Sequence, residues 1–237
     1  MNKKTNTLIV SITIICLSIA FTSCKKTNET KENMTENILL EEWTGPYGGV
    51  PSFDKMNLAD LKPALEKGME INLKEIDAIT SNPDAATFEN TIVAMEKAGQ
   101  ELDRVFTYYG ILSSNKSSPE FRTIQAEMAP VLSEFRSKIS QNSELFKRIK
   151  TVYDNAVENP LEDDQQRVIQ LIYEGFAMDG AELDDEKKAR YAEINKELSS
   201  LYTNFSNNIL ADEENYVVYL TEDQLGGLAD GMIKSMA

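Results

Sequence analysis

The sequence predicts an all-α fold, a multi-helix antiparallel array of about six long helices. From residue 57 onward, apolar side chains recur every three or four positions almost without interruption, which is the period of one helix face. Capping residues precede these periodic segments, and proline or glycine breaks separate them. No internal repeat period is visible, which disfavours a helical solenoid.

The six expected helices are defined by these periods and breaks. They cover about residues 58–79, 88–112, 119–139, 143–157, 163–178 and 184–210. Asn57 and Thr87 are expected to cap the first two, with Asn90 at the capping-box position of the second. Ser118 is expected to cap the third. Pro130 lies inside that third helix and predicts a kink or a split, because proline removes a backbone hydrogen bond.

Only one segment has the composition of a strand. Residues 216–220 read Tyr-Val-Val-Tyr-Leu, a run of aromatic and β-branched residues, so a short strand is predicted there. Residues 221–237 then begin another helical stretch. We therefore expect a helical region over 58–237 that is truncated at its C-terminal end.

Charge and composition exclude several function classes. Lys and Arg number 24 against 39 Asp and Glu, a net charge of −15, so nucleic acid is not expected as a partner. The chain contains no histidine. A His-Glu-x-x-His zinc site, a Ser-His-Asp triad and a Cys-His pair are therefore all impossible within it.

The N-terminus predicts export and a lipid anchor. Residues 1–23 have the basic, apolar and small-residue regions of a signal peptide, ahead of Cys24. This junction resembles the lipobox of bacterial lipoproteins, which implies lipidation of Cys24 and membrane attachment in the bacterial cell envelope. An ordinary secretory signal with an incidental cysteine is the alternative. Residues 25–37 are polar and have no apolar period, and a flexible tether is expected over residues 24–40.

Residues 41–57 form an unusual segment between this tether and the helices. We expect an extended structural strap rather than a ligand-binding segment. Two prolines would stiffen it and three aromatic side chains would anchor it: Pro46, Pro51, Trp43, Tyr47 and Phe53.

Two acidic clusters invite a calcium interpretation. Residues 162–164 and 184–186 lack the alternating acidic spacing and central glycine of a calcium loop. Each stands at a helix start, so helix capping is the favoured interpretation. Four tyrosines are expected in the core or at its rim rather than on a ligand platform: Tyr108, Tyr109, Tyr191 and Tyr202.

Several stretches together resemble one known family. "NILLEEWTGPYGGVPSFDKM", "LKPALEKGMEINLKEIDAI", "NPDAATFENTIVAMEKAGQELDRV" and "GAELDDEKKARYAEINKELSSLYTNFSNNILAD" follow one another in the order found in peptidyl-dipeptidases. These enzymes belong with oligopeptidase A and thimet oligopeptidase to one family of zinc metallopeptidases. The resemblance covers about residues 37–237.

The resemblance implies that the helices form part of one lobe of a two-lobed peptidase. In that family a deep channel admits short peptides, and zinc held by two His and a Glu activates a water. No catalytic, cofactor-binding or metal-binding residue can be carried over to this chain, so it should be inactive alone. The expectation is a non-catalytic N-terminal part that supplies channel wall and substrate gating. A free-standing helical lipoprotein that binds peptides or a partner protein is the alternative.

Overall fold

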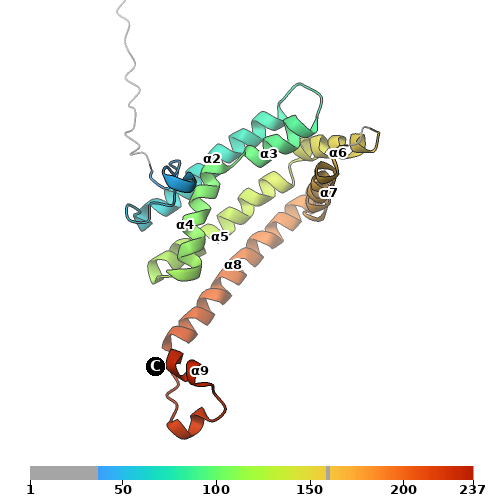
Figure 1. Ribbon diagram of the computed structural model, residues 1–237. Coiled ribbons are helices and arrows are strands. Elements are labelled where there is room, and N and C mark those ends of the chain that lie inside the picture. Colours follow the sequence, from blue (N-terminus) through green and yellow to red (C-terminus); the bar gives the residue numbers. More distant parts are fainter. Residues whose placement is uncertain (1–36, 159–160, 237) are drawn as a thin grey trace, which may run out of the picture. The chain divides into compact units, whose positions relative to one another are not determined.

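The computed structural model describes residues 37–158 and 161–236, and the part it describes is all-α, which confirms the predicted fold class (Figure 1). The α-helices are α2 (Leu61–Thr80), α3 (Ala94–Lys97), α4 (Gln100–Asn115), α5 (Pro119–Ser140), α6 (Ser143–Glu158), α7 (Asp163–Met178), α8 (Asp185–Asn215) and α9 (Asp230–Met236). A π-helix covers Phe88–Val93, and short 3-10 segments cover Pro46–Gly48, Leu58–Asp60 and Glu222–Leu225.

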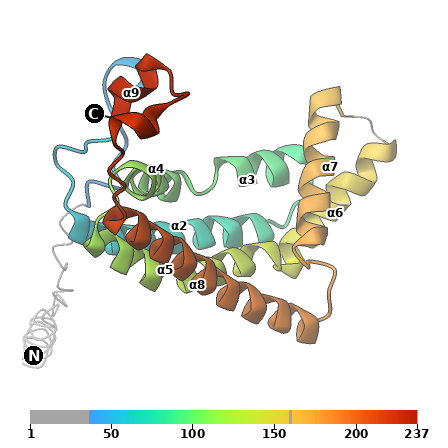
Figure 2. The same ribbon diagram turned by 90° about the horizontal axis from the view of Figure 1, so that it is seen from below.

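The long helices pack in antiparallel pairs. The α2 helix packs on α4, α6 packs on α7, and α5 runs beside α8, as Figures 1 and 2 show from two directions. The close approach of α2 to α4 depends on Gly68, because a Cβ there would lie 3.0 Å from the Cα of Leu102. Short connections between successive helices favour this arrangement.

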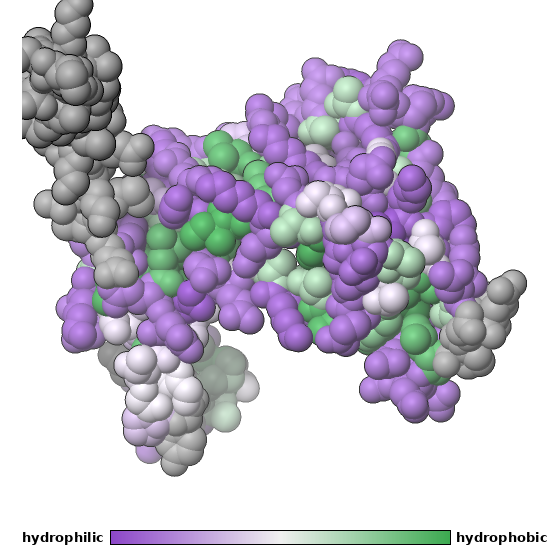
Figure 3. Space-filling view, turned by 90° about the horizontal axis from the view of Figure 1, so that it is seen from above, coloured by the Kyte–Doolittle hydropathy of each residue, from purple (hydrophilic) through white to green (hydrophobic). Residues whose placement is uncertain are grey.

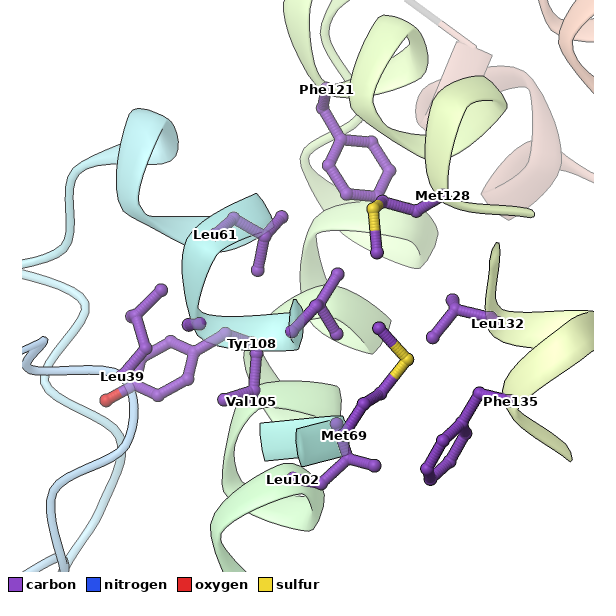
Figure 4. Close-up of a cluster of buried hydrophobic side chains, with 12 residues drawn as sticks. Leu39, Leu61, Met69, Leu102, Val105, Tyr108, Phe121, Met128, Leu132 and Phe135 are labelled. Carbon is purple, nitrogen blue, oxygen red and sulfur yellow. The ribbon is translucent and has the colours of Figure 1, made fainter. Parts of the chain in front are cut away.

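Two clusters of buried side chains hold the helices together. The first joins α2, α4 and α5 with one residue before the strap, and Figure 4 shows how its side chains converge: Leu39, Leu61, Ala64, Leu65, Met69, Leu102, Val105, Tyr108, Phe121, Met128, Leu132 and Phe135. The second joins α2, the π-helix, α6 and α7: Ile76, Ile79, Ile92, Leu145, Ile149, Val152 and Ile169. On the face drawn in Figure 3, hydrophilic residues predominate with apolar ones between them.

The expected helix over 88–112 is interrupted, so its prediction as one helix is wrong. Thr87 does cap it, and Asn90 completes the capping box. The break comes at Gly99, whose φ of +85° is a left-handed conformation that favours glycine. Its N–H donates a 2.7 Å hydrogen bond to the carboxylate of Glu75 on α2, which satisfies the donor exposed by the break.

Three further expectations also need correction. Residues 216–220 form no strand in the described part of the chain, because no second strand lies beside them to complete a ladder. Pro130 does not split α5, which continues from Ser118, its cap, to Ser140. The sixth helix ends at Asn215, beyond the expected residue 210.

The strap packs on α4 through aromatic side chains. Trp43 and Phe53 contact the buried Tyr108, with ring centroids at 6.3 and 5.0 Å. The hydroxyl of Tyr108 accepts a 2.8 Å hydrogen bond from the backbone N–H of Ser52. The side chain of Tyr47 lies outside the described part of the structure. These contacts fit the structural role expected of the strap.

The expected tether boundary at residue 40 lies too far along the chain. Leu39 is fully buried in the first core cluster, and Arg104 donates hydrogen bonds of 3.0 and 3.1 Å to the carbonyl of Leu40. The folded part therefore already includes these two residues. The predicted signal peptide, Cys24 and residues 25–36 lie outside the described residues.

Candidate functional site

Helix α8 carries an apolar stripe that faces away from the core. Its members recur every three or four residues and are all exposed; we call them the α8 stripe: Ile194, Leu198, Leu201, Phe205 and Ile209. Leu201 is 55% exposed and Phe205 is 64% exposed. Folded proteins seldom leave a continuous apolar stripe in water, because burying such side chains is a main source of stability.

The opposite side of α8 is mainly small and polar, and it is the less exposed side. Its partly buried members include Ala192, Ser199, Thr203 and Asn207, together with Leu210 near the end of the helix. At 100° per residue these positions lie across the helix from the α8 stripe. The helix therefore packs on α5 through its polar side and leaves its apolar side open.

Three polar contacts fix this orientation. At the start of α8, Lys188 donates hydrogen bonds to the carbonyl of Gln141, at 3.3 Å, and to the hydroxyl of Ser143, at 2.9 Å. In its middle, Lys196 lies 3.2 Å from the carboxylate of Glu134 on α5. Hydrogen bonds from Lys138 and then Lys196 hold the pKa of Glu134 below its ordinary value.

The third contact lies at the far end of the helix pair. Arg122 of α5 donates hydrogen bonds of 2.8 and 3.2 Å to the two carboxylate oxygens of Glu214. This arginine also lines a shallow groove between α5 and α8, with Ala126, Ser200 and Asn204. Its side chain is only 14% exposed. Because Glu214 already occupies the guanidinium, the groove offers no open cation to a peptide carboxylate.

The acidic clusters serve as helix caps. The carboxylate of Asp184 accepts a 2.9 Å hydrogen bond from the N–H of Lys187, and Glu162 is the N-cap of α7, in a capping box with Gln165. Interaction with Lys187 also lowers the pKa of Asp184. Over residues 37–158 and 161–236, no group of His, Cys, Asp or Glu has the arrangement of a metal site.

The four tyrosines occupy different environments. Tyr108 is a core residue, as expected, and Tyr109 and Tyr191 are partly buried. Burial raises the pKa of Tyr109 above its ordinary value. Tyr202 is exposed on α8, next to the α8 stripe.

In the described part of the chain, no helix has the length and apolar character that a membrane span requires.

Sequence reasoning identified the apolar period of α8 but assigned it to the core. The signal that could have corrected this is the composition of the other side. A helix exposed to water on its outer side usually carries many charged residues there, whereas α8 has mainly alanine, serine, threonine and asparagine opposite the stripe, with Lys196 and Glu214 paired to α5. Small residues of this kind allow the close packing of α8 on α5.

Comparison with known proteins shows which family this helical array resembles. Residues 62–188 match the family described as Neurolysin/Thimet oligopeptidase, N-terminal domain. The chain is 30% identical over 178 residues to dipeptidyl carboxypeptidase of Salmonella typhimurium, a match over 75% of this chain and 26% of that protein. It is 29% identical over 197 residues to dipeptidyl carboxypeptidase of Escherichia coli, over 83% of this chain and 29% of that protein.

The match to a differently named relative covers similar shares of the two chains. Oligopeptidase A of Escherichia coli is 26% identical over 185 residues, which is 78% of this chain and 27% of that protein. The match thus spans little more than a quarter of each of these relatives. The chain belongs to the thimet oligopeptidase family, whose N-terminal domain its residues 62–188 match.

Proposed function

We propose that this chain is the non-catalytic N-terminal part of a zinc-dependent peptidyl-dipeptidase or oligopeptidase that hydrolyses short peptides. In this proposal the helices supply one wall of the peptide channel and help to gate the entry of substrate. Two relatives are named dipeptidyl carboxypeptidase, and their name supports the release of dipeptides from the C-termini of peptides as the proposed reaction.

The observation that carries this proposal is the exposed α8 stripe, in a chain whose match spans little more than a quarter of the length of its relatives. An apolar stripe on a helix whose other side is already packed requires a further layer of protein. The remaining three quarters of a relative-sized polypeptide would provide it.

The chemistry would reside entirely in that remainder. Zinc sites of metallopeptidases use histidine ligands, and this chain contains no histidine. The zinc ion, its ligands and the general base would therefore all come from the rest of the polypeptide. The residues of this chain would bound the channel and exclude folded proteins from it.

The proposed enzyme is anchored to the cell envelope. Cleavage after residue 23 and lipidation of Cys24 would attach it to the membrane, with residues 25–36 as the tether. This placement rests on the sequence pattern alone. It would position the peptidase to act on short peptides in the envelope.

The alternative function is a free-standing helical lipoprotein that binds peptides or a partner protein without catalysis. The groove between α5 and α8 is the surface that favours it. In that case the α8 stripe would have to be covered by a ligand or partner rather than by the same polypeptide.

Analysis of the native product separates the two. An antibody against residues 85–110 is used to detect and isolate the product from membranes of the source cells. The proposal predicts a product far larger than 26.6 kDa that releases dipeptides and loses this activity with EDTA. A product of the chain's own size without EDTA-sensitive activity would support the free-standing lipoprotein.

A further inference from the structure

The segment that follows α8 has the character of a strand without a partner. Residues 216–220 belong to no helix, the backbone of Tyr216 is extended, and all five side chains are exposed, with Tyr219 at 89%. Within the described part of the chain, the backbone groups of residues 217–220 make no backbone hydrogen bond. Each unpaired N–H and C=O is available to a neighbouring strand.

Both faces of this segment are apolar. Alternate residues of a strand point to opposite faces, so Tyr216, Val218 and Leu220 share one face and Val217 and Tyr219 share the other. A strand with one face in water alternates apolar and polar residues. A strand that is apolar on both faces is typical of one covered on both sides.

We propose that residues 216–220 become a β-strand by pairing with a strand from the part of the longer polypeptide that lies outside this 237-residue chain. This inference rests on the proposed function, because only the longer polypeptide contains that partner. The segment directly follows α8, so the strand and the α8 stripe would be covered by the same remainder.

Charge disfavours a second copy of this chain as the partner. An antiparallel pairing centred on Val218 would bring the acidic end of α8, with Glu213 and Glu214, close to Glu222 and Asp223 of the other copy. Like charges brought close together at both ends of the ladder oppose such a pairing. A parallel pairing in register would also place these carboxylates together. The partner strand is therefore expected to be apolar with lysine or arginine at its ends.

A peptide substrate is also a poor partner. It would pair with one edge of the segment but would leave the two apolar faces in water. Covering both faces requires packed elements above and below the strand, which a larger stretch of polypeptide supplies.

Hydrogen exchange at residues 217–220 tests this proposal. In the 237-residue chain alone, these amides should exchange rapidly at both low and high protein concentration. In the longer polypeptide, exchange should slow by about tenfold or more at the alternate amides that face the partner strand, because ladder hydrogen bonds protect them. Protection in the chain alone at high concentration would identify a second copy as the partner and overturn the proposal. Rapid exchange of all four amides in the longer polypeptide would overturn it as well.

Proline variants identify the hydrogen bonds that protect these amides from exchange. Neighbouring amides of a strand point to opposite edges, so either Val217→Pro or Val218→Pro must remove a ladder donor. That variant of the longer polypeptide should lose protection at the remaining amides, while Val218→Thr, which keeps the N–H and the β-branch, should retain it. In the chain alone neither proline should change the melting temperature. Full protection in both proline variants would contradict the proposed ladder.

The two proposals fail in different ways. A longer, EDTA-sensitive peptidase in which residues 217–220 exchange rapidly would refute the strand and leave the proposed function standing. A native product of the chain's own size would refute the proposed function, and the strand proposal with it.

Discussion

Replacing Leu201 and Phe205, at the centre of the α8 stripe, by serine should make the isolated chain more soluble at little cost in stability. Burying a whole Leu or Phe side chain contributes about 1.5–3 kcal/mol. Phe205 is 64% exposed, so its buried third contributes about 0.5–1 kcal/mol, and Leu201, which is 55% exposed, contributes about 1 kcal/mol. Leu201→Ser and Phe205→Ser should therefore each lower the free energy of unfolding by about 1 kcal/mol or less.

Urea unfolding and dye binding check this prediction. The double variant should bind less 8-anilinonaphthalene-1-sulfonate and remain soluble at higher concentration, because the exposed apolar area is smaller. The midpoint of urea unfolding should move only slightly at unchanged slope. A loss of about 3 kcal/mol or more at either site would mean that the side chain is buried in solution, and would refute the orientation of α8. Unchanged dye binding would refute the stripe as the exposed apolar surface.

Four further changes probe the rest of the fold. Leu145→Ala should lower the free energy of unfolding by about 2–5 kcal/mol in urea titrations, because the side chain is fully buried in the second core cluster. Tyr108→Phe removes the acceptor of the Ser52 N–H and should cost about 1–3 kcal/mol, with faster proteolysis of the strap. Gly99→Ala forces a side chain into a left-handed conformation 3.0 Å from the amide of a buried asparagine, and should cost about 1 kcal/mol or more by calorimetry. Glu70 should titrate at about pH 2 by NMR, below its ordinary 4.5, because Lys74 and Lys67 favour its charged form; its contribution to stability is complete above pH 4.5 and is lost as the pH falls towards 2.

Matched variants distinguish these effects from general damage. Tyr109→Phe should leave the strap as resistant to protease as before, because Tyr109 makes no contact with Ser52. Gly110→Ala, within α4 and with open space around it, should be neutral or stabilising. Lys74→Ala should raise the pKa of Glu70. A midpoint of Glu70 near 4.5 in the unmodified chain would contradict the ion pairs on α2.

Local signals in the sequence were sufficient for most of the helices. Thr87, Ser118 and Asp184 begin helices because their side chains accept backbone N–H groups within three residues, a contact that needs no distant partner. The break at Gly99 was missed because the apolar period continues through it. Its stability depends on Glu75 of another helix, a long-range contact that no local pattern shows.

The candidate surface was harder to predict than the helices. The period of the α8 stripe marks it as a buried face, but periodicity does not tell which protein layer covers it. The strand predicted at residues 216–220 illustrates the same limit of sequence-based prediction. Composition indicates a strand there, but a strand forms only with a partner, and none lies beside these residues in the described part of the chain. The absence of histidine was the most decisive sequence signal, since it excludes a His-Glu-x-x-His zinc site from this chain.

The most direct test of the central claim is the accessibility of the α8 stripe in the native, longer product. Leu201→Cys is compared with Glu193→Cys, which lies on the same helix away from the stripe, and thiol labelling at each site is followed by peptide mass spectrometry. The account predicts that both sites label rapidly in the isolated chain and that only Leu201→Cys becomes protected in the longer product. Equal labelling of Leu201→Cys in both would contradict the claim that this helical domain is covered by the rest of a peptidase.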